Sequence, residues 1–131
     1  MRKVVRTPRA PRARGPYSQA IVADGFVFVA GQGPINPESN QLDLGNIRSQ
    51  TKRTLENLRA ILVTAGSSLR DVVRVSVFLA DMKDYEAMNE VYRKFFPTDP
   101  PARTTVGARL PKTKMKIEVD CIARLPRLGR R

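Results

Sequence analysis

Three side chains near the C-terminal end of the chain, Arg103, Thr105 and Glu118, offer a guanidinium, a hydroxyl and a carboxylate. Residues 103–109 and 115–124 are each predicted to form a strand, and Thr104, Val106, Ala108 and Leu110 suit the buried face of the first. Arg103 and Thr105 then lie on the opposite face, which Glu118 shares if the two strands pair. This surface is a solvated face, an ion pair or a site for a small anionic ligand, and the pattern leaves these alternatives open.

The composition excludes several kinds of catalytic site. The chain has 131 residues, no histidine and one cysteine, Cys121. It therefore cannot build a Ser-His-Asp or Cys-His nucleophile system or a zinc site of cysteines and histidines. A lone thiol forms no disulfide within the chain, so we expect a reducing compartment and a cytoplasmic protein. The alternation of residues 115–124 predicts that Cys121 is a buried packing residue.

The formal net charge of +12 is concentrated at the two ends of the chain. Residues 1–14 hold six basic side chains and no acidic one, and residues 124–131 hold four arginines and no acidic residue. We interpret these stretches as basic arms, which are either solubilising tails or weak contacts for a nucleic-acid backbone. Neither arm has the interleaved aromatic residues of a base-stacking platform.

No apolar run approaches the ~18 residues of a membrane span, so no membrane association is predicted. The arginine-rich start also lacks the apolar centre of a secretory signal. Pro8 and Pro11 oppose the amphipathic helix of a mitochondrial transit peptide, which makes that destination the less favoured one.

The remaining pattern predicts one α+β domain, residues 1–131, with a mixed sheet and two helices on one of its faces. Asp24-Gly25 predicts a type I′ hairpin turn, and Asn46 and Gly66 are suited to cap a long helix. The predicted strands are 4–5, 18–23, 26–30, 73–79, 103–109 and 115–124, and the predicted helices are 46–65 and 84–96.

Five stretches carry a resemblance to a known family: GPYSQA at 15–20, FVFVAGQGPINPES at 26–39, TLENLRAILVTAGSSLRDVV at 54–73, VFLADMKDYEAMNEVYRKFF at 77–96 and PARTTVGARLPKTKMKIEVDCIA at 101–123. The chain resembles the Rid (YjgF-type) family of reactive-intermediate deaminases over about residues 3–124. The resemblance implies a chorismate-mutase-like fold with a six-stranded sheet, assembled as a homotrimer with its sites in the clefts between subunits.

The resemblance also implies an activity, the hydrolysis of enamine and imine intermediates such as 2-aminoacrylate, 2-iminopropanoate and 2-iminobutanoate to 2-oxo acids and ammonia. No cofactor and no metal are expected. Arg103 matches the arginine that binds the substrate carboxylate, for which its planar fork is suited. Glu118 matches the acid that positions or deprotonates the attacking water, with an ion pair to Arg103 as the alternative.

Five further positions match the substrate-binding surroundings in that family. Tyr17 could pack on the substrate and offer its hydroxyl, or it could serve packing alone. Gly31 allows close backbone approach, and Asn89 is either near the ligand or structural. Ala30 stands where many relatives have serine, and Thr105 where many have cysteine, so Ala30 removes a hydroxyl whereas Thr105 keeps one.

Two other functions remain open on the sequence. The first is an RNA-associated or translation-inhibiting protein, because some relatives are associated with endoribonuclease activity and the basic arms suit a phosphate backbone. The second is a non-catalytic binder of small carboxylates in the same clefts.

Overall fold

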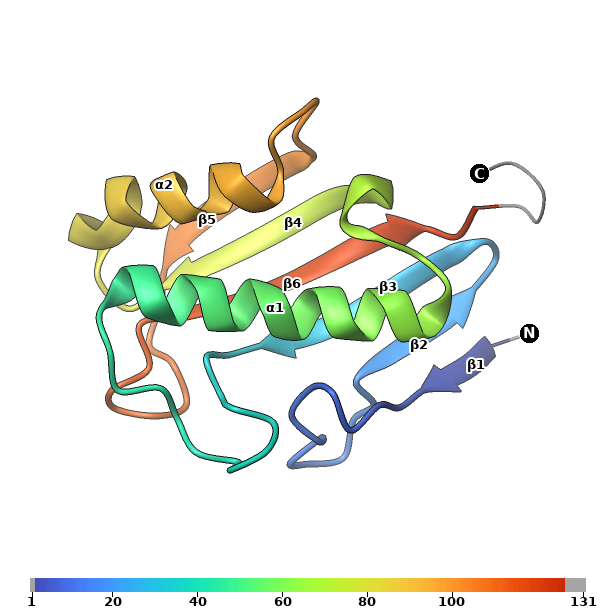
Figure 1. Cartoon of the computed structure of the whole chain (residues 1–131), viewed down its shortest axis with the longest axis horizontal. Helices are drawn as coiled ribbons and strands as arrows, with labels where there is room; N and C mark the ends of the chain where they lie inside the picture. Colours follow the sequence, from blue (N-terminus) through green and yellow to red (C-terminus); the bar gives the residue numbers. More distant parts are fainter. Residues whose placement is uncertain (1, 127–131) are drawn as a thin grey trace.

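Six strands form one mixed sheet in the order β1-β2-β3-β6-β4-β5, and two helices cover one of its faces (Figure 1). The structure is a computed structural model that describes residues 2–126. The predicted fold class is confirmed. The strands are β1 (Arg2–Val5), β2 (Ala20–Ala23), β3 (Phe26–Gln32), β4 (Val72–Leu79), β5 (Ala102–Gly107) and β6 (Ile117–Arg124).

The β2–β3 hairpin closes at the predicted turn. Asp24 has a φ of 51° and Gly25 a φ of 83°, so both central residues lie in the left-handed region that a type I′ turn requires. β3 then pairs with β6, and the register shifts between Val29 and Gln32. This irregularity places Ala30 and Gly31 at a local distortion of β3.

The two helices are α1 (Ile47–Ala65) and α2 (Tyr85–Phe95), and short 3-10 turns at Leu69–Asp71 and Met82–Asp84 precede β4 and α2. The side-chain oxygen of Asn46 accepts a hydrogen bond from the Ser49 backbone N–H at 3.0 Å, and Gly66 follows the helix with a φ of 91°. Both predicted caps of α1 are confirmed. Four fully buried apolar side chains of α1 belong to the core that the helices form with the sheet, namely Leu55, Leu58, Ile61 and Leu62.

Replacing Asn46 with alanine removes the acceptor at the start of α1. We expect the free energy of unfolding to fall by about 1 kcal/mol, measured by urea denaturation, because one N–H of the first turn loses its partner. Asn46→Asp keeps an acceptor at the same position and should retain most of the stability. Equal denaturation midpoints for the alanine variant and the wild-type chain would show that this cap contributes nothing.

β5 lies at the edge of the sheet, parallel to β4, and β4 separates it from β6. The pairing of the last two strands considered above is therefore wrong. The chain passes from β4 through α2 to β5, and such a helical crossover joins neighbouring parallel strands. Arg103 and Glu118 consequently stand on strands that do not touch.

The N-terminal basic segment is part of the fold over its described residues. β1 pairs with β2, and the side-chain amide of the buried Gln19 donates hydrogen bonds to the carbonyls of Thr7, Ala10 and Pro11. The basic side chains of residues 2–14 are exposed on this fixed backbone. Residues 127–131 of the C-terminal arm lie outside the described residues. No helix within residues 2–126 has the length and apolar composition needed to cross a bilayer.

Candidate active site

Arg103 lies on the helix-covered side of the sheet. The parallel register places Arg103 beside Val75 and Thr105 beside Val77, and both valines are fully buried under the helices. Residues paired across strands share a face, so the predicted orientation of β5 is wrong. Thr104 and Val106, predicted to be in the core, are exposed. The error has a physical cause, because an edge strand is partly solvated on both faces and its apolar alternation carries little information.

Two tyrosines of α2 surround the Arg103 guanidinium. The guanidinium carbon lies 4.6 Å from the centre of the Tyr92 ring and 5.6 Å from that of Tyr85, and Nη2 donates a hydrogen bond to the Tyr85 hydroxyl at 3.2 Å. Both ring distances are within the range of cation–π attraction. Within residues 2–126 no carboxylate forms an ion pair with Arg103. The guanidinium is therefore held by aromatic groups, with its charge available to an anion.

Asn89 and Thr105 are placed by the same two elements. Asn89 has the helical spacing of the two tyrosines on α2, is buried, and donates from Nδ2 to Glu86 at 3.1 Å. The Thr105 hydroxyl is buried and has no hydrogen-bond partner among the described residues. We call Arg103, Tyr85, Asn89, Tyr92 and Thr105 the arginine cluster.

Glu118 lies on the opposite, uncovered face of the sheet. It pairs with Phe78 on β4, whereas its neighbours Ile117 and Val119 are fully buried beneath the helices. The Glu118 carboxylate lies against Gly31 of β3, in the space that a Cβ at position 31 would need. Glycine at this position therefore permits the close approach of the two residues. Burial, and secondarily the negative charge of Asp120, raises the pKa of Glu118.

Tyr17 and Ala30 are joined to this region through the backbone. The Ala30 N–H donates to the Gln19 carbonyl at 2.9 Å, which connects β3 to the segment that carries Tyr17. The Tyr17 side chain is 52% exposed, and its hydroxyl accepts a hydrogen bond from the Arg14 backbone N–H at 3.2 Å. We call Glu118, Gly31, Ala30 and Tyr17 the glutamate group.

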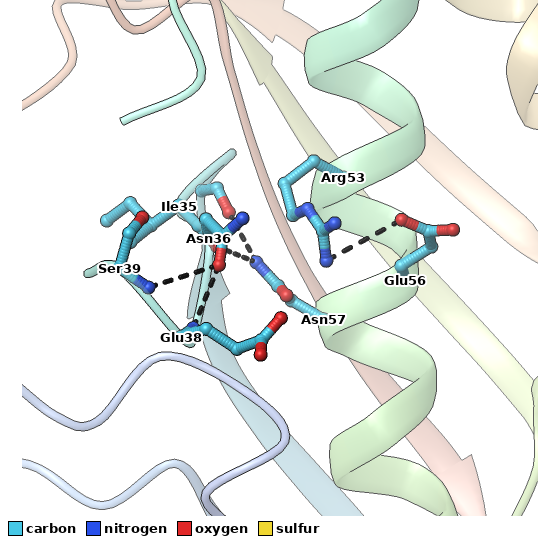
Figure 2. A network of polar contacts seen from close by, with 8 residues as sticks. Ile35, Asn36, Glu38, Ser39, Arg53, Glu56 and Asn57 are labelled. Carbon is cyan, nitrogen blue, oxygen red and sulfur yellow. Dashed lines mark hydrogen bonds and ion pairs between the residues drawn. The ribbon is translucent and has the colours of Figure 1, made fainter. Parts of the chain in front are cut away.

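A buried amide holds the loop that follows β3 (Figure 2). Asn57 on α1 donates from Nδ2 to the carbonyls of Gly33 and Ile35, at 3.0 and 2.8 Å. Asn36 then accepts hydrogen bonds from the backbone N–H groups of Glu38 and Ser39 (Figure 2). The strand end that carries Gly31 is thus fixed to the helix layer.

The two residues predicted to be catalytic, Arg103 and Glu118, therefore lie on opposite sides of one chain. The ion pair between Arg103 and Glu118 that was the alternative to a site does not form, because the two side chains lie on different faces. Sequence reasoning missed Tyr85 and Tyr92. Their signal was present in the spacing of residues 85, 89 and 92, which places all three on one side of a helix.

Two further ionisable groups take protonated forms near neutral pH. Burial raises the pKa of Tyr92 against the lowering influence of Arg103, so the ring beside the guanidinium stays a neutral phenol. Burial, and secondarily the charge of Asp120, raises the pKa of Cys121 to about 12. Cys121 is buried as predicted, in a protonated form suited to packing. Across the part of the chain that the structure describes, no three histidine, cysteine, aspartate or glutamate side chains converge as metal ligands would.

Comparison with known proteins finds similarity over nearly the whole chain. Residues 7–125 match the family model described as endoribonuclease L-PSP. A RutC family protein of Pyrococcus abyssi is 50% identical over 123 residues, which cover 93% of this chain and 96% of the relative. Reactive Intermediate Deaminase A, chloroplastic, of Arabidopsis thaliana is 40% identical over 95% of this chain and 66% of its own length.

A solved structure gives the same result for the fold. The crystal structure of Escherichia coli TdcF with bound serine superposes with a TM-score of 0.88 at 37% sequence identity, covering 93% of this chain and 98% of that chain. The similarity therefore extends over the strands and helices that carry both the arginine cluster and the glutamate group.

Proposed function

The chain belongs to the endoribonuclease L-PSP family, the Rid or YjgF type, and from this membership we propose that it hydrolyses reactive 2-imino acids to 2-oxo acids and ammonia. The proposed substrates are 2-iminopropanoate, 2-iminobutanoate and their enamine tautomers. Relatives named reactive intermediate deaminase support the reaction class. The two sets of polar residues support the assignment of roles.

The observation that carries the proposal is the set of groups that surround the Arg103 guanidinium. Its guanidinium lies close to two tyrosine rings and donates a hydrogen bond to the hydroxyl of one of them, and no carboxylate of residues 2–126 pairs with it. A positive charge in this setting gains from binding an anion that enters from solvent. A carboxylate is the anion whose two oxygens match the guanidinium fork.

We propose that the active unit is a homotrimer in which the arginine cluster of one subunit meets the glutamate group of the next. In a single chain Arg103 and Glu118 lie on opposite sides of the sheet, so they cannot act on one small ligand. The uncovered face also presents large apolar side chains, with Phe26, Phe28 and Val106 each 40–43% exposed. Exposed large apolar side chains on an uncovered sheet face favour contact with another copy of the chain.

The proposed chemistry needs a carboxylate anchor and a base. Arg103 binds the carboxylate of the 2-imino acid through two parallel hydrogen bonds. Glu118 accepts a proton from water as the water oxygen bonds to the imine carbon, and the nitrogen takes up a proton. When the carbon–nitrogen bond of this adduct breaks, the hydroxyl loses its proton, and the 2-oxo acid and ammonia leave.

The test is imine decay in the presence of the wild-type protein. A dehydratase acting on threonine generates 2-iminobutanoate in place, and semicarbazide traps the imine that survives. We expect less trapped imine as the protein concentration rises, with dehydratase turnover unchanged. Heat-denatured protein serves as the control. Decay no faster than in that control would rule out this substrate and the proposed activity toward it.

An RNA-directed activity is the second candidate. The family description and the exposed basic side chains of residues 2–14 favour it. Phosphate contacts by these side chains are independent of Arg103 and weaken steeply with salt. RNA binding that falls with salt and persists in Arg103→Ala, together with no imine hydrolysis, would favour this candidate over the deaminase.

A further inference from the structure

We propose that Tyr85 is a second ligand-binding residue of the arginine cluster, and that its hydroxyl donates a hydrogen bond to the carboxylate bound by Arg103. This inference rests on the proposed function, because it adds a contact to the same anion site. It makes the site selective for carboxylates over neutral carbonyl compounds through two side chains instead of one.

The hydrogen bonds that the Tyr85 hydroxyl makes, and the one it leaves unmade among the described residues, indicate this role. A phenol can accept one hydrogen bond and donate another. The Tyr85 oxygen accepts from Arg103 Nη2 at 3.2 Å, and no group within residues 2–126 accepts the Tyr85 hydroxyl proton. Tyr85 is 37% exposed and its hydrogen bond with Arg103 lies at the surface, so this proton is accessible from solvent beside the guanidinium. Accepting a hydrogen bond from a cation increases the ability of the hydroxyl to donate in turn.

The geometry of a carboxylate fits the two donors together. Its two oxygens offer about four acceptor positions, of which a guanidinium fork uses two. A third donor adjacent to the fork can therefore bind the same group without competing with it. A primary amide offers one oxygen with two acceptor positions and brings an NH2 group toward the guanidinium, so it cannot accept from the whole fork and the hydroxyl together.

Tyr92 differs from Tyr85 in a way that separates their roles. Its ring is the nearer one to the guanidinium, at 4.6 Å, but its side chain is only 5% exposed. Tyr92 therefore supports Arg103 from within the core, whereas Tyr85 stands at the solvent side of the same cation. The two residues are seven positions apart on α2, which places them on one side of the helix two turns apart.

The test measures binding of 2-oxobutanoate, the product of the proposed reaction, by isothermal titration calorimetry. We expect Tyr85→Phe to raise the dissociation constant about tenfold, as for the loss of one hydrogen bond to a charged group. Lys94→Ala removes an exposed charge from the same helix and should leave the constant within about twofold. In the imine assay, Tyr85→Phe should raise KM and leave kcat nearly unchanged.

Each outcome bears on the proposal. Unchanged 2-oxobutanoate affinity in a folded Tyr85→Phe protein overturns it, and so does an absence of measurable binding by the wild-type chain. The same titration with 2-oxobutanamide, the corresponding primary amide, tests selectivity. If Tyr85→Phe loses equal affinity for 2-oxobutanoate and for 2-oxobutanamide, the proposal is also overturned, since the hydroxyl would then not select the carboxylate. Tyr85-dependent binding without imine hydrolysis supports this inference while contradicting the proposed function, so the two failures can be distinguished.

Discussion

Replacing Arg103 with alanine is expected to lower kcat/KM for 2-iminobutanoate by about a hundredfold or more. Two hydrogen bonds to a carboxylate, each contributing about 1.5–3 kcal/mol, account for an effect of this size. The alanine also leaves the ligand carboxylate without a counter-charge next to the rings of Tyr85 and Tyr92. The measurement is the semicarbazide-trap assay at several imine concentrations.

Two matched variants separate the guanidinium fork from charge alone. Arg103→Lys keeps a positive charge but loses the bidentate geometry, so we expect an activity between those of the wild-type and alanine proteins. Arg109→Ala removes an exposed charge just beyond β5 and should keep the wild-type rate. A folded Arg103→Ala protein with more than half of the wild-type kcat/KM would remove Arg103 from the site.

Local sequence signals were sufficient for most of the fold. The Asp24-Gly25 turn, the Asn46 cap and Gly66 all lie where backbone chemistry permits few alternatives, and the structure confirms them. The alternation in β6 also gave the correct faces, because a central strand is fully buried under the helices on one side. These elements depend on residues close to them in the chain.

β5 could not be oriented in the same way. Its exposed residues include Val106, while the charged Arg103 is half-buried against α2, so polarity there is a poor guide to the face. The pairing was accessible by another argument, since a strand, a helix and a second strand in succession favour a parallel crossover. A parallel crossover places β5 beside β4 and so separates Arg103 from Glu118.

The candidate site was also predictable only in part. Arg103 and Glu118 were selected by residue type and by family resemblance, and the structure adds that they belong to opposite sides of the sheet. Tyr85 and Tyr92 were missed because aromatic residues on an amphipathic helix usually indicate core packing. Only the crossover of α2 over β5 reveals that they contact a guanidinium.

Replacing Glu118 with glutamine is expected to lower kcat by about 10²–10⁴-fold, the usual contribution of a general base. In the wild-type protein kcat/KM should fall as pH decreases through the pKa of Glu118, which lies above the ordinary glutamate value. Asp120→Asn removes a charge that raises this pKa, so the fall should move to lower pH. If the fall of kcat/KM at low pH persists unchanged in Glu118→Gln, that fall belongs to the titration of another group.

Mixing the two inactive variants tests whether the site is shared between subunits. Each proposed site takes Arg103 from one subunit and Glu118 from its neighbour, so a randomly mixed trimer of Arg103→Ala and Glu118→Gln chains regains intact residues in about a quarter of its sites. We therefore expect about a quarter of the wild-type activity after the chains are unfolded and refolded together in equal amounts. Variants refolded separately provide the baseline. If both residues act within one chain, every site keeps one defect and mixing restores nothing.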